Sequence, residues 1–151
     1  MKIKDFVSKD SIELNLKEET KKEHMAEMVG LLVDAGVVKE KASGKIIKEL
    51  LKREEMGSTG IGGGIAIPHI KTDEVSSVAG AIGISKKGID FDALDGEPVY
   101  VSFLLLTPTG APNEHLKALS EISAFLKDDI TIKDLKELES SRKAYKFIKK
   151  I

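Results

Sequence analysis

The stretch Gly57-Ser-Thr-Gly-Ile-Gly-Gly-Gly-Ile-Ala-Ile-Pro-His69 joins a glycine-rich turn to a short apolar segment that ends in a proline and a histidine. Glycines let backbone amides approach an anion closely, and Pro68 restricts the backbone beside His69. An imidazole with an ordinary pKa of about 6.5 can be neutral and nucleophilic near neutral pH. The pattern indicates a histidine held in place for chemistry, and phosphoryl transfer is the reaction that it favours.

The composition fits one domain over residues 1–151 of an ordinary globular protein, with 41% apolar and 32% charged residues. The 24 basic residues balance 25 acidic ones, so there is no global field and nucleic acid is not an expected partner. The absence of cysteine excludes disulfides, thiolate zinc sites and cysteine nucleophiles. The first residues lack the apolar core of a signal peptide, and the longest hydrophobic run, Val99 to Leu106, is too short to span a membrane. We therefore expect a cytoplasmic protein without membrane insertion.

The first half of the chain predicts a strand over residues 12–16 and then two helices. Thr20-Lys-Lys-Glu23 has the spacing of a capping box, and Gly36 stands where a helix that begins there would end. A second helix is expected to stop near Gly57, and its apolar stripe consists of Ala42, Ile46, Ile47, Leu50 and Leu51. We expect these helices to form a hairpin that covers a sheet.

The second half predicts central strands over residues 65–67, 78–84 and 99–106, because short apolar or β-branched runs are bounded there by turn residues. A third helix is expected from a cap at Asn113 to about Leu126, with an inward stripe of Leu116, Leu119, Ile122 and Leu126. A basic helix from about Ser141 would turn Ala144, Tyr145 and Ile148 inward. The predicted fold class is α/β or α+β, a single domain with a mixed β-sheet flanked by helices.

The glycine cluster does not match either common nucleotide-binding motif. The third glycine of the dinucleotide fingerprint falls on Ile65, and no Gly-Lys-Ser or Gly-Lys-Thr follows. The order of elements is also reversed, since this loop leaves a helix and enters a strand. A flexible connection is the alternative, and His69 at the end of the loop favours a site.

The other two histidines differ in their expected roles. His24 falls in a first helical turn rich in lysine and glutamate, which predicts a surface position. His115 falls in the first turn of the third helix, where free amides favour an anion and disfavour a charged imidazole. His115 is therefore a candidate neutral hydrogen-bond donor to a phosphoryl group, and an ordinary residue of a helix start is the alternative.

Arg53 is the only arginine besides Arg142 in a chain that otherwise uses lysine. Its guanidinium offers a planar fork for two phosphoryl oxygens and lies one turn before the glycine loop, although a solvated helix end is an equally good interpretation. The candidate phosphate-binding loop consists of Ser58, Thr59, Gly60 and Gly62. Serine and threonine beside glycine are also ordinary turn residues.

Taken together, these motifs resemble the fructose/mannitol class of enzyme IIA domains of the bacterial phosphoenolpyruvate-dependent sugar phosphotransferase system. In chain order they are Arg53 with the turn Gly57-Ser-Thr-Gly-Ile-Gly, Ile65-Ala-Ile-Pro-His69, Phe91-Asp-Ala-Leu-Asp-Gly-Glu-Pro98, Phe103-Leu-Leu-Leu and Asn113-Glu-His115-Leu-Lys-Ala-Leu-Ser. The resemblance runs from roughly the first helix to the end of the third. It implies a mixed sheet flanked by helices, of the kind seen in phosphotransferase/anion transport proteins.

The resemblance also implies roles and partners. His69 would accept a phosphoryl group from the phosphocarrier protein HPr and pass it to an enzyme IIB domain, while Arg53 and His115 would support that group electrostatically. No cofactor is implied, and a metal bound by His69 and His115 has little support because no third ligand stands at recognisable spacing. The alternative is a nitrogen-regulatory protein whose phosphorylation state controls binding to transporters or regulators, with little onward transfer.

Two positions depart from the family pattern. Family members commonly have glycine directly after the reactive histidine, where this chain has Ile70, and mannitol-type members have an acidic loop residue where this chain has Gly63. The second departure points toward the fructose or nitrogen-regulatory branch. The transported sugar is not specified, because specificity in this system resides mainly in the membrane component.

Overall fold

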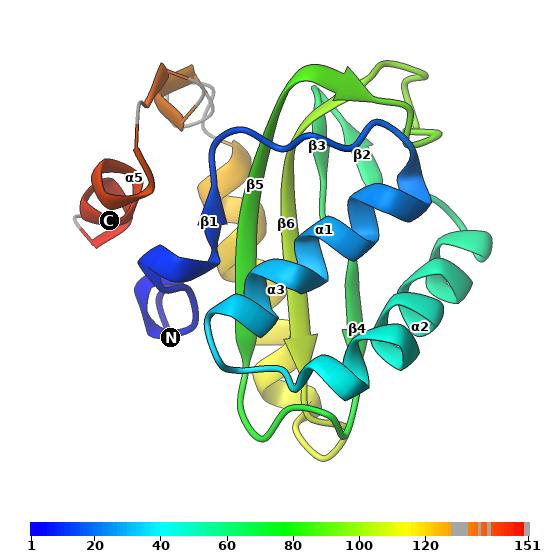
Figure 1. The fold of residues 1–151 in the computed structure, drawn as a ribbon, viewed down its shortest axis with the longest axis vertical. Helices are drawn as coiled ribbons and strands as arrows, with labels where there is room; N and C mark the ends of the chain where they lie inside the picture. The colour runs from blue at the N-terminus through cyan, green and yellow to red at the C-terminus, as the bar shows by residue number, and fades with distance from the viewer. Residues whose placement is uncertain (128–132, 136, 139, 150–151) are drawn as a thin grey trace.

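A mixed β-sheet with helices on both faces forms the core of the computed structural model, which describes residues 1–127, 133–135, 137, 138 and 140–149 (Figure 1). Six strands are described, in the order β1-β5-β6-β3-β2, with β4 also paired to β6. Their bounds are β1 Ile12–Glu13, β2 Gly60–Gly62, β3 Ile65–Ala66, β4 His69–Lys71, β5 Ala79–Ile89 and β6 Val99–Thr107. The predicted fold class and the three predicted central strands are confirmed.

The antiparallel pair β5 and β6 is the centre of this sheet. β1 runs parallel to β5, while β3 and β4 both run parallel to β6, one after the other along the same edge. Both faces of β5 and β6 are covered, which explains why these segments are almost continuously apolar. The strands β2 and β4 were not predicted, since three residues containing glycine or charge carry no strand pattern.

One face of the sheet is covered by the two N-terminal helices, α1 Lys21–Asp34 and α2 Ser43–Glu55 (Figure 1). The predicted cap is confirmed, because the Thr20 side chain accepts a hydrogen bond from the Glu23 amide at 3.2 Å. Gly36 follows α1 with φ of 78°, the left-handed conformation expected there. Ile46 and Leu50, which belong to the predicted apolar stripe of α2, are buried in the core. The burial of each side chain contributes about 1.5–3 kcal/mol to folding stability.

The strand expected over residues 12–16 is shorter than predicted. A 3₁₀ helix, η2 Lys9–Ser11, precedes β1, and β1 itself contains only Ile12–Glu13. The Glu13 carboxylate accepts the Asn15 amide at 3.1 Å, which bends the chain away from regular pairing. Leu14 and Leu16 nevertheless remain buried, so the apolar alternation was read correctly.

The opposite face is covered by α3 Pro112–Lys127, while α5 Ser141–Lys149 packs at the edge of the sheet against β1 and η2 (Figure 1). Helix α3 begins at Pro112 rather than after a cap at Asn113, because proline suits the first helical position. Leu116 was wrongly placed inward: it is 67% exposed, and the buried residues of α3 are His115, Ala118, Ile122, Phe125 and Leu126. On α5, Ala144 and Ile148 are buried as expected, whereas Tyr145 is half-buried. Two further short 3₁₀ helices are η1 Ile3–Asp5 and η3 Glu40–Ala42.

The surface position expected for His24 is wrong. His24 is fully buried between α1 and the sheet, with Nε2 2.7 Å from Ser102 Oγ and its ring edge-on to Phe91. Its position one turn before Met28 places it on the apolar face of α1. Burial lowers the pKa of His24 to about 4.

This buried histidine predicts a pH dependence of folding stability. Because the unfolded chain takes up a proton near pH 6.5 and the folded chain only near pH 4, stability falls as the pH falls between these values, by about 3 kcal/mol in total. The substitution His24→Gln keeps a side-chain donor and acceptor for Ser102 but does not titrate. Urea unfolding followed by circular dichroism should give a shallower decline for the variant over that range. If the free energy of unfolding fell equally with pH in the two proteins, the pH dependence would not come from His24.

Candidate functional site

His69 lies at the start of β4, directly after Pro68. The Leu105 amide donates to the Pro68 carbonyl at 2.9 Å, and His69 itself pairs with Leu105, so this backbone is held along β6. The His69 Nδ1 atom lies 2.6 Å from the Ile67 carbonyl oxygen. A carbonyl only accepts hydrogen bonds, so Nδ1 carries the proton, and Nε2 of the neutral ring keeps its lone pair. Nε2 is therefore the nucleophilic nitrogen.

His115 approaches His69 from the first turn of α3. The two ring centroids are 5.7 Å apart, and His115 is 7% exposed. Its Nδ1 lies 2.5 Å from Thr107 Oγ1 at the end of β6, which leaves Nε2 as the ring nitrogen for a ligand. Burial is the main cause that lowers the pKa of His115, and the charges of His69 and Lys71 lower it further. A neutral His115 is thus favoured by burial and by neighbouring charge, which are different causes from the helix start that the sequence suggested.

Arg53 reaches the same place from the last turn of α2. Its Nη1 donates to the Gly57 carbonyl at 2.8 Å. Together with His69 and His115 it lines an open depression of about 520 Å³, whose other lining residues are Glu49, Lys52, Met56, Ile70 and Lys71. Three cationic side chains against one carboxylate make this depression suitable for a dianionic group.

The hydroxyl groups of the predicted phosphate-binding loop have other partners. Ser58 Oγ donates to the Phe91 carbonyl at 2.7 Å and accepts the Gly60 amide at 3.0 Å. The Thr59 hydroxyl and amide both bond to the Glu54 carboxylate. Ser58 and Thr59 do not line the depression that contains His69. A phosphate-binding role for them remains a prediction.

The two glycines of the predicted phosphate-binding loop lie in a strand and do not line the depression. Gly60 and Gly62 belong to β2, which pairs with β3. A Cβ at Gly60 would stand 2.8 Å from the Cβ of Ala93, so glycine is required there by close packing. Their proposed contact with phosphate likewise remains a prediction.

Three residues near the site were missed by the sequence reading. Lys71 lies two residues after His69 in one strand and therefore on the same face, a signal that alternation supplies. Glu54 follows Ile46 and Leu50 at helical spacing on the buried face of α2. A charged residue on this apolar face was the signal that could have identified it. Thr107 carried no comparable signal, because a threonine at the end of a strand is common.

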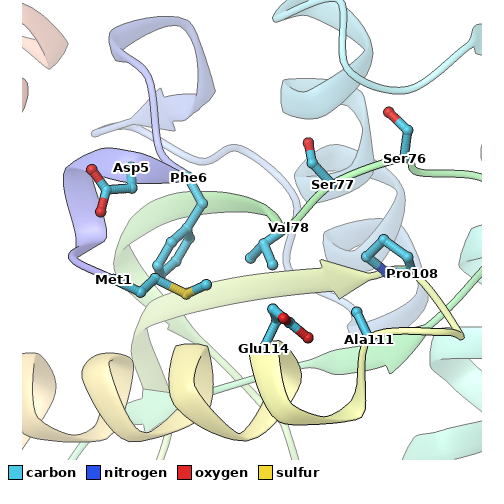
Figure 2. Close-up of a pocket in the computed structure, with 9 residues that line it drawn as sticks. All are labelled: Met1, Asp5, Phe6, Ser76, Ser77, Val78, Pro108, Ala111 and Glu114. Atoms are coloured by element: carbon cyan, nitrogen blue, oxygen red, sulfur yellow. The ribbon is translucent and has the colours of Figure 1, made fainter.

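A second pocket lies on the other side of the first turn of α3 and is unsuited to an anion. Figure 2 shows Phe6 and Val78 in this pocket of about 380 Å³, with the carboxylates of Asp5 and Glu114 beside them. Its lining side chains include no histidine, lysine or arginine. Negative charge would be repelled there, so the depression around His69 is the candidate phosphoryl site.

Within the described ranges, no three histidine, cysteine, aspartate or glutamate side chains gather in a way that would hold a metal ion. Among the same residues, no helix has the length and apolar character needed to cross a membrane.

The family model described as "Phosphoenolpyruvate-dependent sugar phosphotransferase system, EIIA 2" matches residues 5–151. The chain therefore belongs to this enzyme IIA family, whose members are phosphotransferase components, and the resemblance noted from the motifs is confirmed. It is 42% identical over 140 residues to the PTS system fructose-specific EIIABC component of Bacillus subtilis, a match that covers 93% of this chain and 22% of that protein.

Two nitrogen regulatory proteins are similar to the chain over nearly their whole length. The chain is 35% identical over 145 residues to the nitrogen regulatory protein of Bradyrhizobium diazoefficiens, covering 96% of this chain and 93% of that protein. The crystal structure of nitrogen regulatory protein IIA-Ntr from Neisseria meningitidis matches with a TM-score of 0.86 at 30% identity, over 97% of this chain and 98% of the other. This chain thus spans about a fifth of the Bacillus subtilis fructose-specific protein but almost all of these two nitrogen regulatory proteins.

The electrostatic coupling in the site predicts a measurable change at His115. Because the charge of Lys71 lowers the pKa of His115, Lys71→Ala should raise that pKa toward its ordinary value. An NMR titration of the imidazole nitrogens measures it directly. Lys52→Ala, which removes another cation lining the depression, is the matched control and should leave the His115 titration nearly unchanged.

Proposed function

We propose that this protein is a phosphocarrier of the phosphoenolpyruvate-dependent sugar phosphotransferase system, in which His69 accepts a phosphoryl group from HPr and passes it to an enzyme IIB domain. One observation carries the proposal: the hydrogen bond from His69 Nδ1 to the Ile67 carbonyl leaves a lone pair on Nε2 beside a cationic depression. Family membership supports the same reaction class.

The proposed reaction is an in-line transfer between two imidazoles. The lone pair of His69 Nε2 forms a bond to phosphorus while the bond from phosphorus to the donor imidazole breaks, and the donor nitrogen keeps that electron pair. The proton on His69 Nδ1 stays in its hydrogen bond to Ile67, which stabilises the positive charge that the ring gains. No proton has to leave the attacking ring.

The surrounding cations stabilise the loose transition state. Charge spreads over three equatorial phosphoryl oxygens, and the groups that can meet them are the Arg53 guanidinium, the Lys71 ammonium and an N–H of neutral His115. All three line the depression before the phosphoryl group arrives, so little reorganisation is needed. The neutral state of His115 lets it donate a hydrogen bond without adding repulsion against the charge that His69 gains.

This mechanism is tested by phosphorylation with phosphoenolpyruvate, enzyme I and HPr, followed by intact mass. His69→Ala should take up no phosphoryl group. His115→Ala should still react, but roughly 10- to 1000-fold more slowly, since it loses one donor to the transition state. His24→Gln, which removes a histidine outside the depression, is the control and should react like the wild type. Undiminished uptake by His69→Ala would reject the proposal.

The depression is shallow and open, as transfer from one protein to another requires. One exposed apolar side chain lines it, Met56, which is 82% exposed. A second exposed apolar residue, Leu116, is not part of the lining but directly follows the lining residue His115 on α3, and it is 67% exposed. We propose that HPr and enzyme IIB dock on these side chains through a transient interface of about 1,200 Å² or less.

The docking surface gives a separate prediction. Met56→Ser or Leu116→Ser should raise the KM for phosphorylated HPr by roughly tenfold at little cost in kcat, because burial of a large apolar side chain contributes to binding alone. Leu94→Ser is the matched control, since Leu94 is 78% exposed but neither lines the depression nor adjoins a residue that does. An equal effect of all three substitutions would contradict this docking surface.

A second function is favoured by the similarity to nitrogen regulatory proteins over 93% of the length of one of them. In that case the phosphorylation state of His69 controls binding to transporters or regulators, and little phosphoryl group moves onward. Incubation of the phosphorylated protein with a set of enzyme IIB domains separates the two: rapid loss of the phosphoryl group to one of them supports transport, and retention with all of them supports regulation.

A further inference from the structure

Glu54 is a buried carboxylate next to Arg53, but it does not line the depression. Its side chain is 3% exposed and lies 3.1 Å from the Lys21 ammonium. The amide of Thr59 donates to the carboxylate at 3.1 Å, and the Thr59 hydroxyl donates to it as well. A buried charge with one cation and two hydrogen bonds is satisfied where it lies, so it is strongly held.

The first set of contacts leads from Glu54 to Arg53. The Glu54 backbone carbonyl accepts the Gly57 amide at 3.1 Å, and the Gly57 carbonyl accepts Arg53 Nη1 at 2.8 Å. The short turn from Glu54 to Thr59 is therefore held at both ends by the same residue, through its backbone and through its carboxylate. The Gly57 carbonyl that orients the guanidinium lies inside this turn.

The second set of contacts leads from Glu54 to His69. The Thr59 carbonyl accepts the Ile67 amide at 3.0 Å, so the position of Thr59 sets the position of the peptide at Ile67. The Ile67 carbonyl in turn accepts His69 Nδ1 at 2.6 Å. Displacement of Thr59 would move the oxygen that keeps the proton on Nδ1.

His69 and Arg53 thus both depend on the turn that Glu54 holds. We propose that Glu54 is a positioning residue for the phosphoryl site, which through Thr59 and Gly57 sets both the protonated nitrogen of His69 and the direction of Arg53. This inference rests on the proposed phosphoryl transfer at His69. Glu54 does not act as a base, because Lys21 and Thr59 occupy its oxygens and the depression lies elsewhere.

Lys21 gives the carboxylate a fixed counter-ion. Its ammonium lies 4.7 Å from the centre of the Phe91 ring, and the Phe91 carbonyl accepts the Ser58 hydroxyl next to Thr59. The cation is therefore held between an aromatic face and the carboxylate. Loss of the negative charge at Glu54 would leave this lysine without compensation and loosen the turn.

The test uses Glu54→Gln, which keeps the size of the side chain but removes its charge. The tautomer of His69 is read from the NMR resonances of its two ring nitrogens in the unphosphorylated protein, above the titration range. We expect the wild type to hold the proton on Nδ1 and the variant to show a mixture with the Nε2-protonated form. Phosphorylation by HPr should be roughly 10- to 100-fold slower, as is usual when a reacting group is slightly misplaced.

The controls separate positioning from general damage. Glu55→Gln changes the exposed neighbouring carboxylate and should leave both readouts unchanged. Thr59→Val removes one hydroxyl contact and should shift the tautomer in the same direction, whereas Thr59→Ser restores the hydroxyl and the wild-type tautomer. If Glu54→Gln does not fold, as judged by circular dichroism, the Thr59 pair decides the question.

The outcomes also distinguish this inference from the proposed function. A wild-type protein that takes up no phosphoryl group would refute the function, while the tautomer measurement would still show whether Glu54 positions His69. A folded Glu54→Gln protein, or Thr59→Val if that variant is needed, with the wild-type tautomer of His69 and the transfer rate of Glu55→Gln would overturn the inference.

Discussion

The alignment of residues 65–71 along the edge of β6 is the constraint on which the site depends. β3 and β4 each pair in parallel with β6, and the Pro68 carbonyl between them accepts the Leu105 amide. This edge places His69 beside the end of β6, where Thr107 and the first turn of α3 bring His115 within 5.7 Å, centroid to centroid. Because β6 is buried on both faces, the frame that carries the two histidines is rigid.

The three histidines differ in how deeply they are buried and in what they contact. His24 is fully buried, contacts Ser102 and Phe91, and takes no part in the depression. His115 is buried at the border of the depression, and this burial lowers its pKa and favours the neutral ring. His69 is only partly buried, which leaves its ring accessible to another protein.

Much of the fold was predictable from the sequence because its signals were local. The cap at Thr20, the glycine after α1 and the apolar runs of β5 and β6 depend on neighbouring residues, and each prediction was confirmed. The errors arose where the sheet overrides local preference. Leu116 was expected inside because the sequence does not tell how far α3 is rotated against the sheet. His24 was expected outside because its charged neighbours were given more weight than its helical spacing from Met28.

The sequence by itself determined the family and the mixed sheet, and it singled out Arg53, His69 and His115 as candidate site residues, because ordered motifs and hydrophobic periodicity are properties of the linear chain. Only the tertiary structure decided that these three line one depression while Ser58 and Thr59 face other partners. It also decided which nitrogen of His69 carries the proton. The reason is geometric. The bond between His69 and Ile67 is local, but the bonds that hold Ile67 to Thr59 and Thr59 to Glu54 form only when the segments around α2, β2 and β3 have packed together.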